Sequence, residues 1–395
     1  MNRMWIKLAL MLAAVSAEAA PPTLLVWING DKAYHALQSV GDDFTAASGI
    51  PVRVEHPEDP PPKFQQAAGA GKGPDIFCWA HDRVGEWAKA GLIVPVHPRK
   101  AMHEAVDAAA WEAFTWQGKT WGYPLAIEAN GLIYNKALVP NPPATWSEVM
   151  VLDQQLAKQG KHAILWDINV TFFSWPLLAG TDAFIFARDK QGNYDPNHVG
   201  LNTAGAVAAG NVMAEMIDRG ALQKGAKYSE MEAGFAQGKI AMMLSGAFAW
   251  ENARRAGIDF GVAPIPGLKP GQPGRAFVGV QGCMITAPSR NKDLAREFIE
   301  RWLMQPDALR RMNAEVPLGV PANTAFYAEL AQNPLIRATM DNARNGITIP
   351  NIPEMGRFWN TMDSAFMSIT NRLQSPKDAL DNAQARMLVG NGTGH

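Results

Sequence analysis

Residues 23–32 read TLLVWINGDK, and this stretch decides the fold. After the initial threonine, the apolar run up to Ile28 has no alternation, which is typical of a strand buried on both faces of a sheet. Asn29 and Gly30 predict a turn. Asp31 then stands at a plausible N-cap position, and apolar residues recur at helical spacing until Gly49. A strand, a tight turn and a helix in this order predict an α/β unit.

The same succession continues along the chain. Strands are predicted at 51–55 and 75–79 and a helix at 81–92, whereas the proline-rich segment 57–62 is predicted to have no regular structure. A second unit begins near residue 131. The whole chain is therefore assigned to the α/β class, with a doubly wound arrangement in its first part.

The second unit shows both helix-start signals and further strands. Two capping boxes, Thr145 to Glu148 and Ser229 to Glu232, predict the first turns of two helices. Strands are predicted at 240–245, 259–263 and 277–285. From residue 291 onward the pattern is almost entirely helical.

Composition excludes several function classes. The chain has 395 residues, enough for two or three domains, and 36 basic against 37 acidic residues give a net charge of −1. This balance disfavours electrostatic binding to nucleic acids or anionic lipid. The two cysteines, Cys78 and Cys283, are too few for a disulfide scaffold or a cysteine-rich zinc module. Both stand in apolar strand-like segments, so we expect buried free thiols, with a bridge left open if the strands are neighbours.

The N-terminus predicts export. Arg3 and Lys7 form a basic start, Leu8 to Val15 is apolar, and residues 17–19 read AEA, which matches a signal-peptidase site. The apolar run is too short to span a bilayer. We therefore expect a cleaved signal peptide at residues 1–19 and a soluble, exported protein, with an uncleaved anchor as the alternative.

Polar residues gather where predicted strands end, which is where ligands bind in open α/β sheets. They are Asn29, Asp31 and Lys32 after the first strand, Trp79, Asp82 and Arg83 after the third, and Glu128 in an apolar segment. Charged and amide groups beside an indole suit a sugar, whose hydroxyls donate and accept while its C–H face packs on an aromatic ring. Alternatively, the aspartates only cap helices and Trp79 is a core residue.

No signal for catalysis or metal binding is complete. The eight histidines form no i,i+4 pair and no cluster with cysteine, so neither a metal nor another cofactor is expected. Asp31, Asp82 and Glu128 leave open the carboxylate pair of a glycoside hydrolase, because the sequence does not give their separation.

Several strings, taken together, resemble a known family. WINGDK at 27–32, WAHDR at 79–83 and PNIP at 350–353 are similar to segments of the periplasmic maltose/maltodextrin-binding proteins of bacterial ABC transporters. The resemblance runs in order along the mature chain. It implies a type II periplasmic binding protein fold with two discontinuous lobes and a hinge. The expected first lobe comprises 20–127 and 281–328, and the second comprises 128–280 and 329–395.

The resemblance also implies a set of sugar-contacting residues. They are Asn29, Asp31, Lys32, Trp79, Asp82, Arg83, Glu128, Phe172, Tyr228, Phe248 and Trp359. The sequence departs from the family pattern, which has Glu, Glu, Tyr, Trp and Arg, at Pro61, Val170, Phe172, Phe248 and Asp363. These departures remove hydrogen-bonding groups from the second lobe, so we expect a short α-glucoside such as maltose or a short maltodextrin, with trehalose as the alternative.

Three function classes follow from these observations. The first is a monomeric, non-catalytic binding subunit that delivers sugar to membrane permease subunits. The second is an exported glycoside hydrolase. The third is a binding protein of the same fold for another ligand, such as ferric ion or a polyamine. A ferric site usually needs paired tyrosines, and the six tyrosines here include no adjacent pair.

Overall fold

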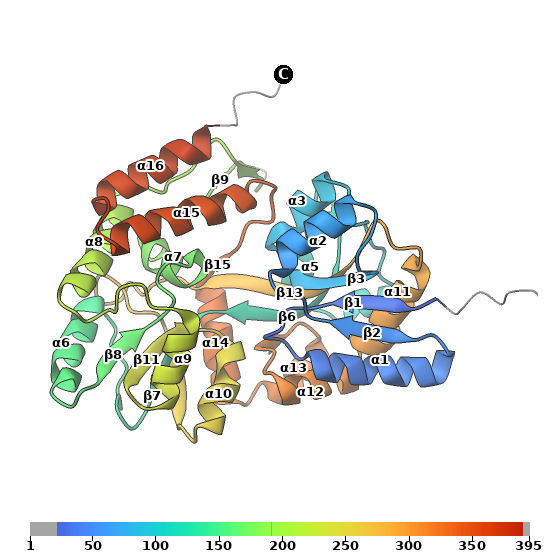
Figure 1. Ribbon diagram of the computed structural model, residues 1–395, viewed down its shortest axis with the longest axis horizontal. Coiled ribbons are helices and arrows are strands. Elements are labelled where there is room, and N and C mark those ends of the chain that lie inside the picture. The colour runs from blue at the N-terminus through green and yellow to red at the C-terminus, as the bar shows by residue number, and fades with distance from the viewer. Residues whose placement is uncertain (1–21, 191, 390–395) are drawn as a thin grey trace, which may run out of the picture.

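The structure, a computed structural model, describes residues 22–190 and 192–389. The predicted signal peptide at 1–19 lies outside these residues. Two main sheets, each flanked by helices, lie side by side in Figure 1. The α/β class predicted from the sequence is confirmed. Within the described ranges, no helix combines the length and apolar character that a membrane crossing requires.

The larger sheet has seven strands in the order β14-β6-β13-β3-β1-β2, and β15 pairs with β13 as a branch. β1 (Leu24–Trp27) lies parallel to both β2 (Val52–Glu55) and β3 (Ile76–Ala80), as a doubly wound unit requires. β13 (Phe277–Ile285) is antiparallel to β3 and to β6 (Tyr123–Ala129). The short strands are β14 (Val320–Pro321) and β15 (Ile347–Thr348).

The smaller sheet has four strands in the order β12-β7-β11-β8. They are β7 (Gly131–Asn135), β8 (His162–Leu165), β11 (Ile240–Ser245) and β12 (Phe260–Ala263). β6 and β13 extend through the middle of the molecule toward this sheet, and β7 begins two residues after β6 ends (Figure 1). The two sheets are therefore joined by long strands rather than by one flexible linker.

Helices cover both sheets (Figure 1). Those beside the larger sheet are α1 (Tyr34–Ser48), α2 (Pro60–Gly69), α3 (Val84–Lys89), α4 (Lys100–Glu104), α5 (Ala108–Ala113), α11 (Lys292–Phe298), α12 (Pro306–Glu315) and α13 (Thr324–Leu330). The others are α6 (Trp146–Ala157), α7 (Thr171–Ala179), α8 (Ala204–Asp218), α9 (Tyr228–Ala236), α10 (Trp250–Arg255), α14 (Pro334–Asn345), α15 (Met355–Thr370) and α16 (Pro376–Leu388). Short turns of helix are η1 (His81–Arg83), η2 (Ala247–Ala249) and η3 (Ile299–Leu303), and two small hairpins are β4–β5 (Thr115–Trp116, Lys119–Thr120) and β9–β10 (Ala187–Arg188, Tyr194–Asp195).

Three local predictions are wrong. The proline-rich segment does not exclude regular structure, because α2 begins at Pro60 and a first turn needs no backbone N–H there. Asp31 does not cap α1, whose N-cap is Ala33 without a side-chain bond. The Ser229 capping box is also displaced: α9 starts at Tyr228, and the Glu230 carboxylate accepts from the backbone N–H of Lys227 at 2.9 Å. The Thr145–Glu148 capping box is confirmed at α6.

The expectation of free thiols is also wrong, because Cys78 and Cys283 form a disulfide. The two residues lie directly opposite each other in the antiparallel pair of β3 and β13. Sequence pattern identified both strands but not that they are neighbours. Disulfides of this kind persist in oxidising compartments, which agrees with export.

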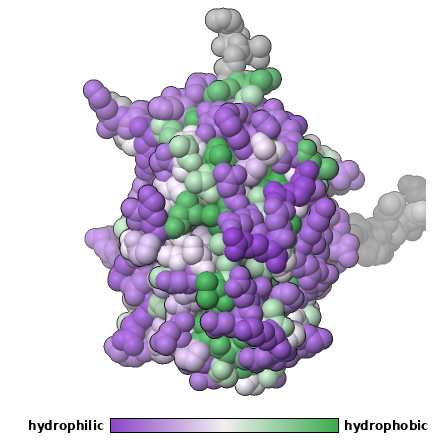
Figure 2. All heavy atoms as spheres, turned by 90° about the vertical axis from the view of Figure 1, so that its left-hand side faces the viewer, coloured by the Kyte–Doolittle hydropathy of each residue, from purple (hydrophilic) through white to green (hydrophobic). Residues whose placement is uncertain are grey.

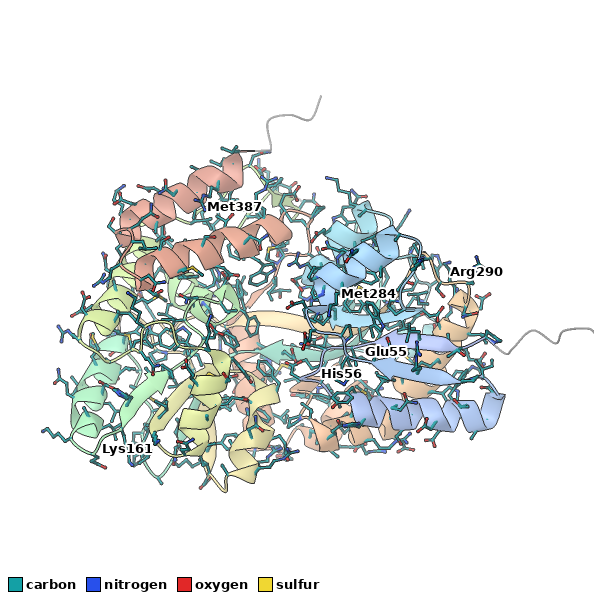
Figure 3. The ribbon with its side chains drawn as sticks, in the orientation of Figure 1. Glu55, His56, Lys161, Met284, Arg290 and Met387 are labelled. Carbon is teal, nitrogen blue, oxygen red and sulfur yellow. A yellow bond between two sulfur atoms is a disulfide. The ribbon has the colours of Figure 1, made fainter. Side chains whose placement is uncertain are left out.

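Side chains fill the space inside both sheet units. Met284 on β13 and Met387 on α16 are buried, whereas Arg290 lies at the surface (Figure 3). The face formed by the smaller-sheet side is mostly hydrophilic with separate hydrophobic spots (Figure 2). Single exposed apolar residues of this kind are ordinary on soluble proteins and need no special function.

Candidate functional site

A cavity of about 410 Å³ lies between the larger-sheet and smaller-sheet sides. Its lining residues are Asn29, Asp31, Lys32, Pro61, Trp79, Ala80, Asp82, Arg83, Glu128, Val170, Phe172, Phe248, Gly279, Gln281, Ile349, Trp359 and Asp363. Every residue that the sequence analysis assigned to the site lies here except Tyr228. All five positions that depart from the family pattern lie here as well. Segments 250 residues and more apart in sequence thus meet around one cavity.

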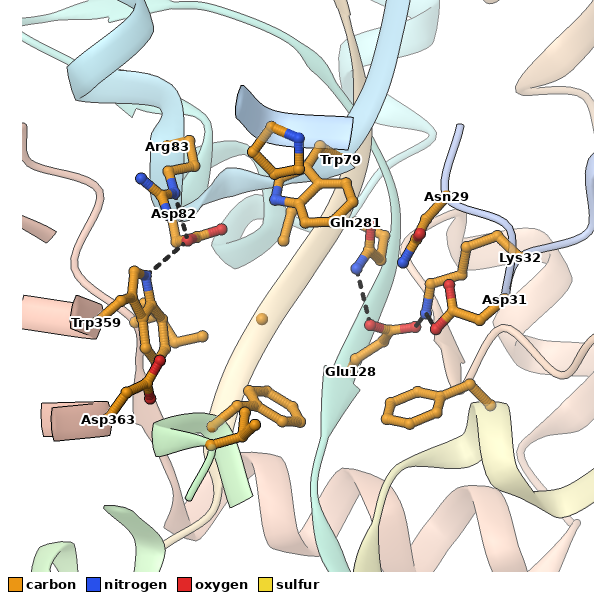
Figure 4. A pocket seen from close by; sticks show the side chains of 17 residues that line it. Asn29, Asp31, Lys32, Trp79, Asp82, Arg83, Glu128, Gln281, Trp359 and Asp363 are labelled. Carbon is orange, nitrogen blue, oxygen red and sulfur yellow. Dashed lines mark hydrogen bonds and ion pairs between the residues drawn. The ribbon is translucent and has the colours of Figure 1, made fainter. Parts of the chain in front are cut away.

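Lys32 is the centre of a charged network on one wall (Figure 4). Its Nζ lies 2.6 Å from Glu128 Oε1 and 3.9 Å from a carboxylate oxygen of Asp31. The same Nζ lies 4.6 Å from the ring centroid of Phe248, within range of a cation–π contact. Burial lowers the pKa of Lys32, but the charges of Asp31 and Glu128 and the hydrogen bond to Glu128 together raise it, so the net pKa is raised and the amine stays protonated. Gln281 Nε2 donates to Glu128 Oε2 at 2.9 Å, so both carboxylate oxygens of Glu128 are held.

Asp82 and Trp359 form a second polar group (Figure 4). The indole N–H of Trp359 on α15 donates to Asp82 Oδ2 at 3.0 Å, and Arg83 Nε lies 3.7 Å from the same oxygen. Arg83 is also paired with Glu86 at 2.9 Å. Burial raises the pKa of Asp82 to about 6, although the Arg83 charge and the Trp359 N–H oppose this shift. A buried carboxylate and a guanidinium are thus presented together at the cavity surface.

Aromatic rings form the remaining walls, and the core holds them in place. Trp79 stacks on Phe77 with centroids 6.1 Å apart. Phe172 and Trp359 both contact Phe277 at the start of β13, at 6.4 and 5.6 Å between centroids. Figure 4 shows Trp79 and Trp359 on different walls. A ligand between them would therefore meet rings that have little freedom to turn away.

The buried side chain of Asn130, just after β6, fixes this aromatic wall to the backbone. Its Nδ2 donates to the carbonyl oxygen of Phe172 at 2.6 Å, and its Oδ1 accepts from the backbone N–H of Phe277 at 2.9 Å. The Asn130 side chain therefore positions both the segment that carries Phe172 and the segment that carries Phe277. A buried amide satisfied in this way rigidifies its surroundings.

Asp363, one of the positions where the resemblance predicts a different residue, has a structural role at the start of α7. Its Oδ1 accepts from the backbone N–H and the hydroxyl of Thr171, at 2.8 and 2.6 Å. Val170, the N-cap residue of α7, offers no capping side chain, so Asp363 supplies the acceptor from α15. Burial raises the pKa of Asp363, and the two bonds from Thr171 oppose the shift.

Tyr228 is the assigned residue that does not line the cavity. Its hydroxyl donates to Glu232 Oε1 at 2.9 Å, and its ring packs 6.2 Å from Phe248 and 5.9 Å from Phe173. Burial, followed by the charge of Glu232, raises the pKa of Tyr228. Tyr228 therefore contacts Phe248, which lines the cavity, but does not line the cavity itself.

Four lining residues were not predicted from the sequence, namely Ala80, Gly279, Gln281 and Ile349. Only Gln281 carried a usable signal, because it is the single polar side chain in the apolar strand FVGVQGCMI. Among the residues that the structure describes, no three His, Cys, Asp or Glu side chains come together as candidate metal ligands.

Comparisons with known proteins all find binding proteins for extracellular solutes or oligosaccharides. A family model described as bacterial extracellular solute-binding protein matches residues 29–308. The chain is 27% identical over 320 residues to the galactooligosaccharide-binding protein of Bacillus subtilis (strain 168), covering 80% of this chain and 76% of that protein. It is 26% identical over 373 residues to the maltotriose-binding protein of Pyrococcus abyssi, covering 92% and 80%. It is 25% identical over 399 residues to the maltodextrin-binding protein MdxE of Bacillus subtilis (strain 168), covering 95% and 93%.

Proposed function

The chain belongs to the bacterial extracellular solute-binding protein family, and we propose that it is the non-catalytic sugar-binding subunit of an ABC importer. The observation that carries this proposal is the cavity itself. Trp79 and Trp359 offer ring faces, while Asp82, Arg83 and the Lys32–Glu128 pair offer charged hydrogen-bonding groups at fixed positions. This combination suits the apolar and hydroxylated faces of a hexose.

The sugar is captured by closure of two lobes about a hinge. We assign 20–127 and 281–328 to the first lobe and 128–280 and 329–395 to the second. The hydrogen bond from Trp359 on α15 to Asp82 on η1 supports closure of the lobes. It joins a residue assigned to the second lobe directly to a residue assigned to the first lobe, at 3.0 Å. Hinge bending around a ligand is a common form of domain closure. The closed, monomeric complex then docks on membrane permease subunits.

The preferred ligand is a short α-glucoside. The relatives named for maltotriose and maltodextrin support an α-glucan, and the relative named for galactooligosaccharides shows that ligands differ within this group. Val170, Phe172 and Phe248 present only apolar surface to the cavity, which favours a ligand with few hydroxyls to satisfy on that side. Maltose is the first candidate. Trehalose is the second, because Val170 leaves room for a more bent disaccharide.

Hydrolysis is the weaker proposal for the same cavity. Both oxygens of Glu128 are occupied by Lys32 and Gln281, and Asp82 accepts from Trp359. These contacts fix the carboxylates as acceptors for ligand hydroxyls.

The proposal also includes export to the periplasm through the predicted signal peptide. The Cys78–Cys283 disulfide supports export, because disulfides persist in oxidising compartments.

Titration calorimetry of the mature protein with maltose, trehalose, maltotriose and maltotetraose tests the proposal. We expect saturable binding of at least one disaccharide and no cleavage product after prolonged incubation. The absence of binding to every sugar would refute the sugar-binding function. The appearance of glucose or shorter oligosaccharides would replace it with hydrolysis.

A further inference from the structure

The Cys78–Cys283 disulfide lies directly behind the charged wall of the main cavity. A second cavity of about 30 Å³ is lined by Cys78 together with Lys32, Glu128 and Gln281, three members of the charged network. Both cysteines are buried, with exposed fractions of 4% for Cys78 and 0% for Cys283. The proposed function uses neither cysteine, so the position of the bridge needs another explanation.

The pairing of β13 with β6 is irregular beside Gln281, because β6 carries one extra residue there. On the β6 side, Gln281 lies opposite Ala126 and Gly282 lies opposite Pro124, so Leu125 has no partner in the ladder. A bulge of this kind re-aims nearby side chains and weakens the local register. Here it accompanies the 2.9 Å bond from Gln281 to Glu128.

The β3 side of the same strand is regular, and the disulfide lies there. Cys283 faces Cys78, two residues after Gln281, and Gln281 itself faces Ala80, which lines the main cavity. The space around the bulge is tight, because a Cβ on Gly282 would come within 2.5 Å of Phe114 and of the Tyr123 carbonyl oxygen. The covalent link therefore fixes β13 on one side at the point where its hydrogen-bonded ladder on the other side is interrupted.

We propose that the Cys78–Cys283 disulfide is a positioning element of the sugar site. It holds the β13 segment that lies opposite the bulge of β6, so that Gln281 remains bonded to Glu128, and Glu128 in turn keeps Lys32 in place. This inference rests on the proposed function, since it concerns the affinity of that site. It goes beyond general stabilisation, because a disulfide that only restrains the unfolded chain would leave the affinity of the folded protein unchanged.

A double-mutant cycle tests the proposal. The bridge is removed with the pair Cys78→Val and Cys283→Ala, which keeps apolar volume, and Gln281→Ala is made with and without the bridge. Calorimetry measures Kd for the tightest-binding disaccharide, and thermal unfolding measures Tm. Val40→Ala, a buried change on α1 away from the cavity, is the control for lost stability alone.

We expect loss of the bridge to raise Kd about fivefold, as coupled neighbouring groups do, and Gln281→Ala to add little further once the bridge is gone. Val40→Ala should lower Tm without changing Kd. Unchanged affinity without the bridge would overturn the proposal. So would equal costs of Gln281→Ala in both backgrounds, because the bridge would then act independently of Gln281.

A second measurement tests the proposal if the variant with Cys78→Val and Cys283→Ala folds poorly. Wild-type protein is reduced with excess phosphine, thiol release is counted, and Kd is measured at a temperature below the new Tm. A raised Kd in the folded, reduced protein supports the proposal, and an unchanged Kd overturns it. Wild-type protein that binds no sugar at all would refute the proposed function and this inference together, whereas binding that is insensitive to the bridge refutes only the inference.

Discussion

Replacing Asp82 by asparagine should strengthen the fold and weaken sugar binding at the same time. Asp82 is only 6% exposed, and burial raises the pKa of its carboxyl from 3.8 to about 6 despite the nearby Arg83. A pKa that is higher in the folded than in the unfolded state means that the ionised form destabilises the fold. The Asp82→Asn change removes that charge and keeps an oxygen that can accept from the Trp359 indole.

The magnitude follows from linkage. A shift of roughly 2 pKa units corresponds to about 3 kcal/mol, which is an upper value for the gain in the free energy of unfolding. With a raised pKa, the stability contribution of Asp82 is complete below pH 4 and is lost as the pH rises through about 6. The variant should therefore match wild-type stability at pH 4 and exceed it at pH 8.

Sugar binding should change in the opposite direction. A hydrogen bond to a charged acceptor contributes about 1 kcal/mol more than one to a neutral amide, so Kd should rise about fivefold to tenfold at pH 8. Urea unfolding without sugar at pH 4, 6 and 8 measures stability, and calorimetry measures Kd. Asp153→Asn is the matched control, because Asp153 is also buried but lies on α6, outside the cavity. An Asp82→Asn variant that is less stable than wild type at pH 8 would refute the reasoning.

Three further outcomes are expected. Trp79→Ala and Trp359→Ala should each weaken disaccharide binding by about 2 kcal/mol, as the loss of an aromatic hot-spot residue does, and sugar should change the tryptophan fluorescence of the wild type. Unchanged Kd in a folded variant would show that this ring is not a sugar contact. Asp363→Ala should lower the free energy of unfolding by about 1 kcal/mol, because Thr171 at the start of α7 loses its acceptor; unchanged urea unfolding would show that this cap is dispensable. A disaccharide should bind at least as tightly as maltotriose, because the apolar side of the cavity satisfies few additional hydroxyls; tenfold tighter binding of maltotetraose would contradict this.

The sequence predicted β1, β2, β3, β11, β12 and β13 because the signals of these strands are local. The strands expected at 240–245 and 277–285 coincide with β11 and β13, whose side chains are apolar except for Ser245 and Gln281. The prolines at 60–62 obscure helix α2 in the sequence, because proline disfavours most regular structure but is tolerated in the first turn of a helix. This error arises because proline disrupts the interior of a helix but is favourable in its first turn.

The candidate site was harder to predict where it depends on which strands are neighbours. Residues in the WINGDK and WAHDR strings line the cavity because they follow adjacent parallel strands. The pairing of Cys78 with Cys283 depends on the antiparallel register of segments 205 residues apart, which no local pattern contains. Tyr228 was assigned by resemblance, but its hydroxyl donates to Glu232 one helical turn later on α9, and its ring does not line the cavity.

The rings that share Phe277 also constrain how this binding protein can acquire a new ligand. A change at Phe277 would disturb Phe172 and Trp359 together, so both aromatic walls would be altered in a single mutational step. Val170 stands at the edge of the cavity with 37% of its surface exposed, so it can change alone. Ligand specificity can therefore change by substitution of Val170 at the edge of the cavity, while Phe172 and Trp359 keep their positions.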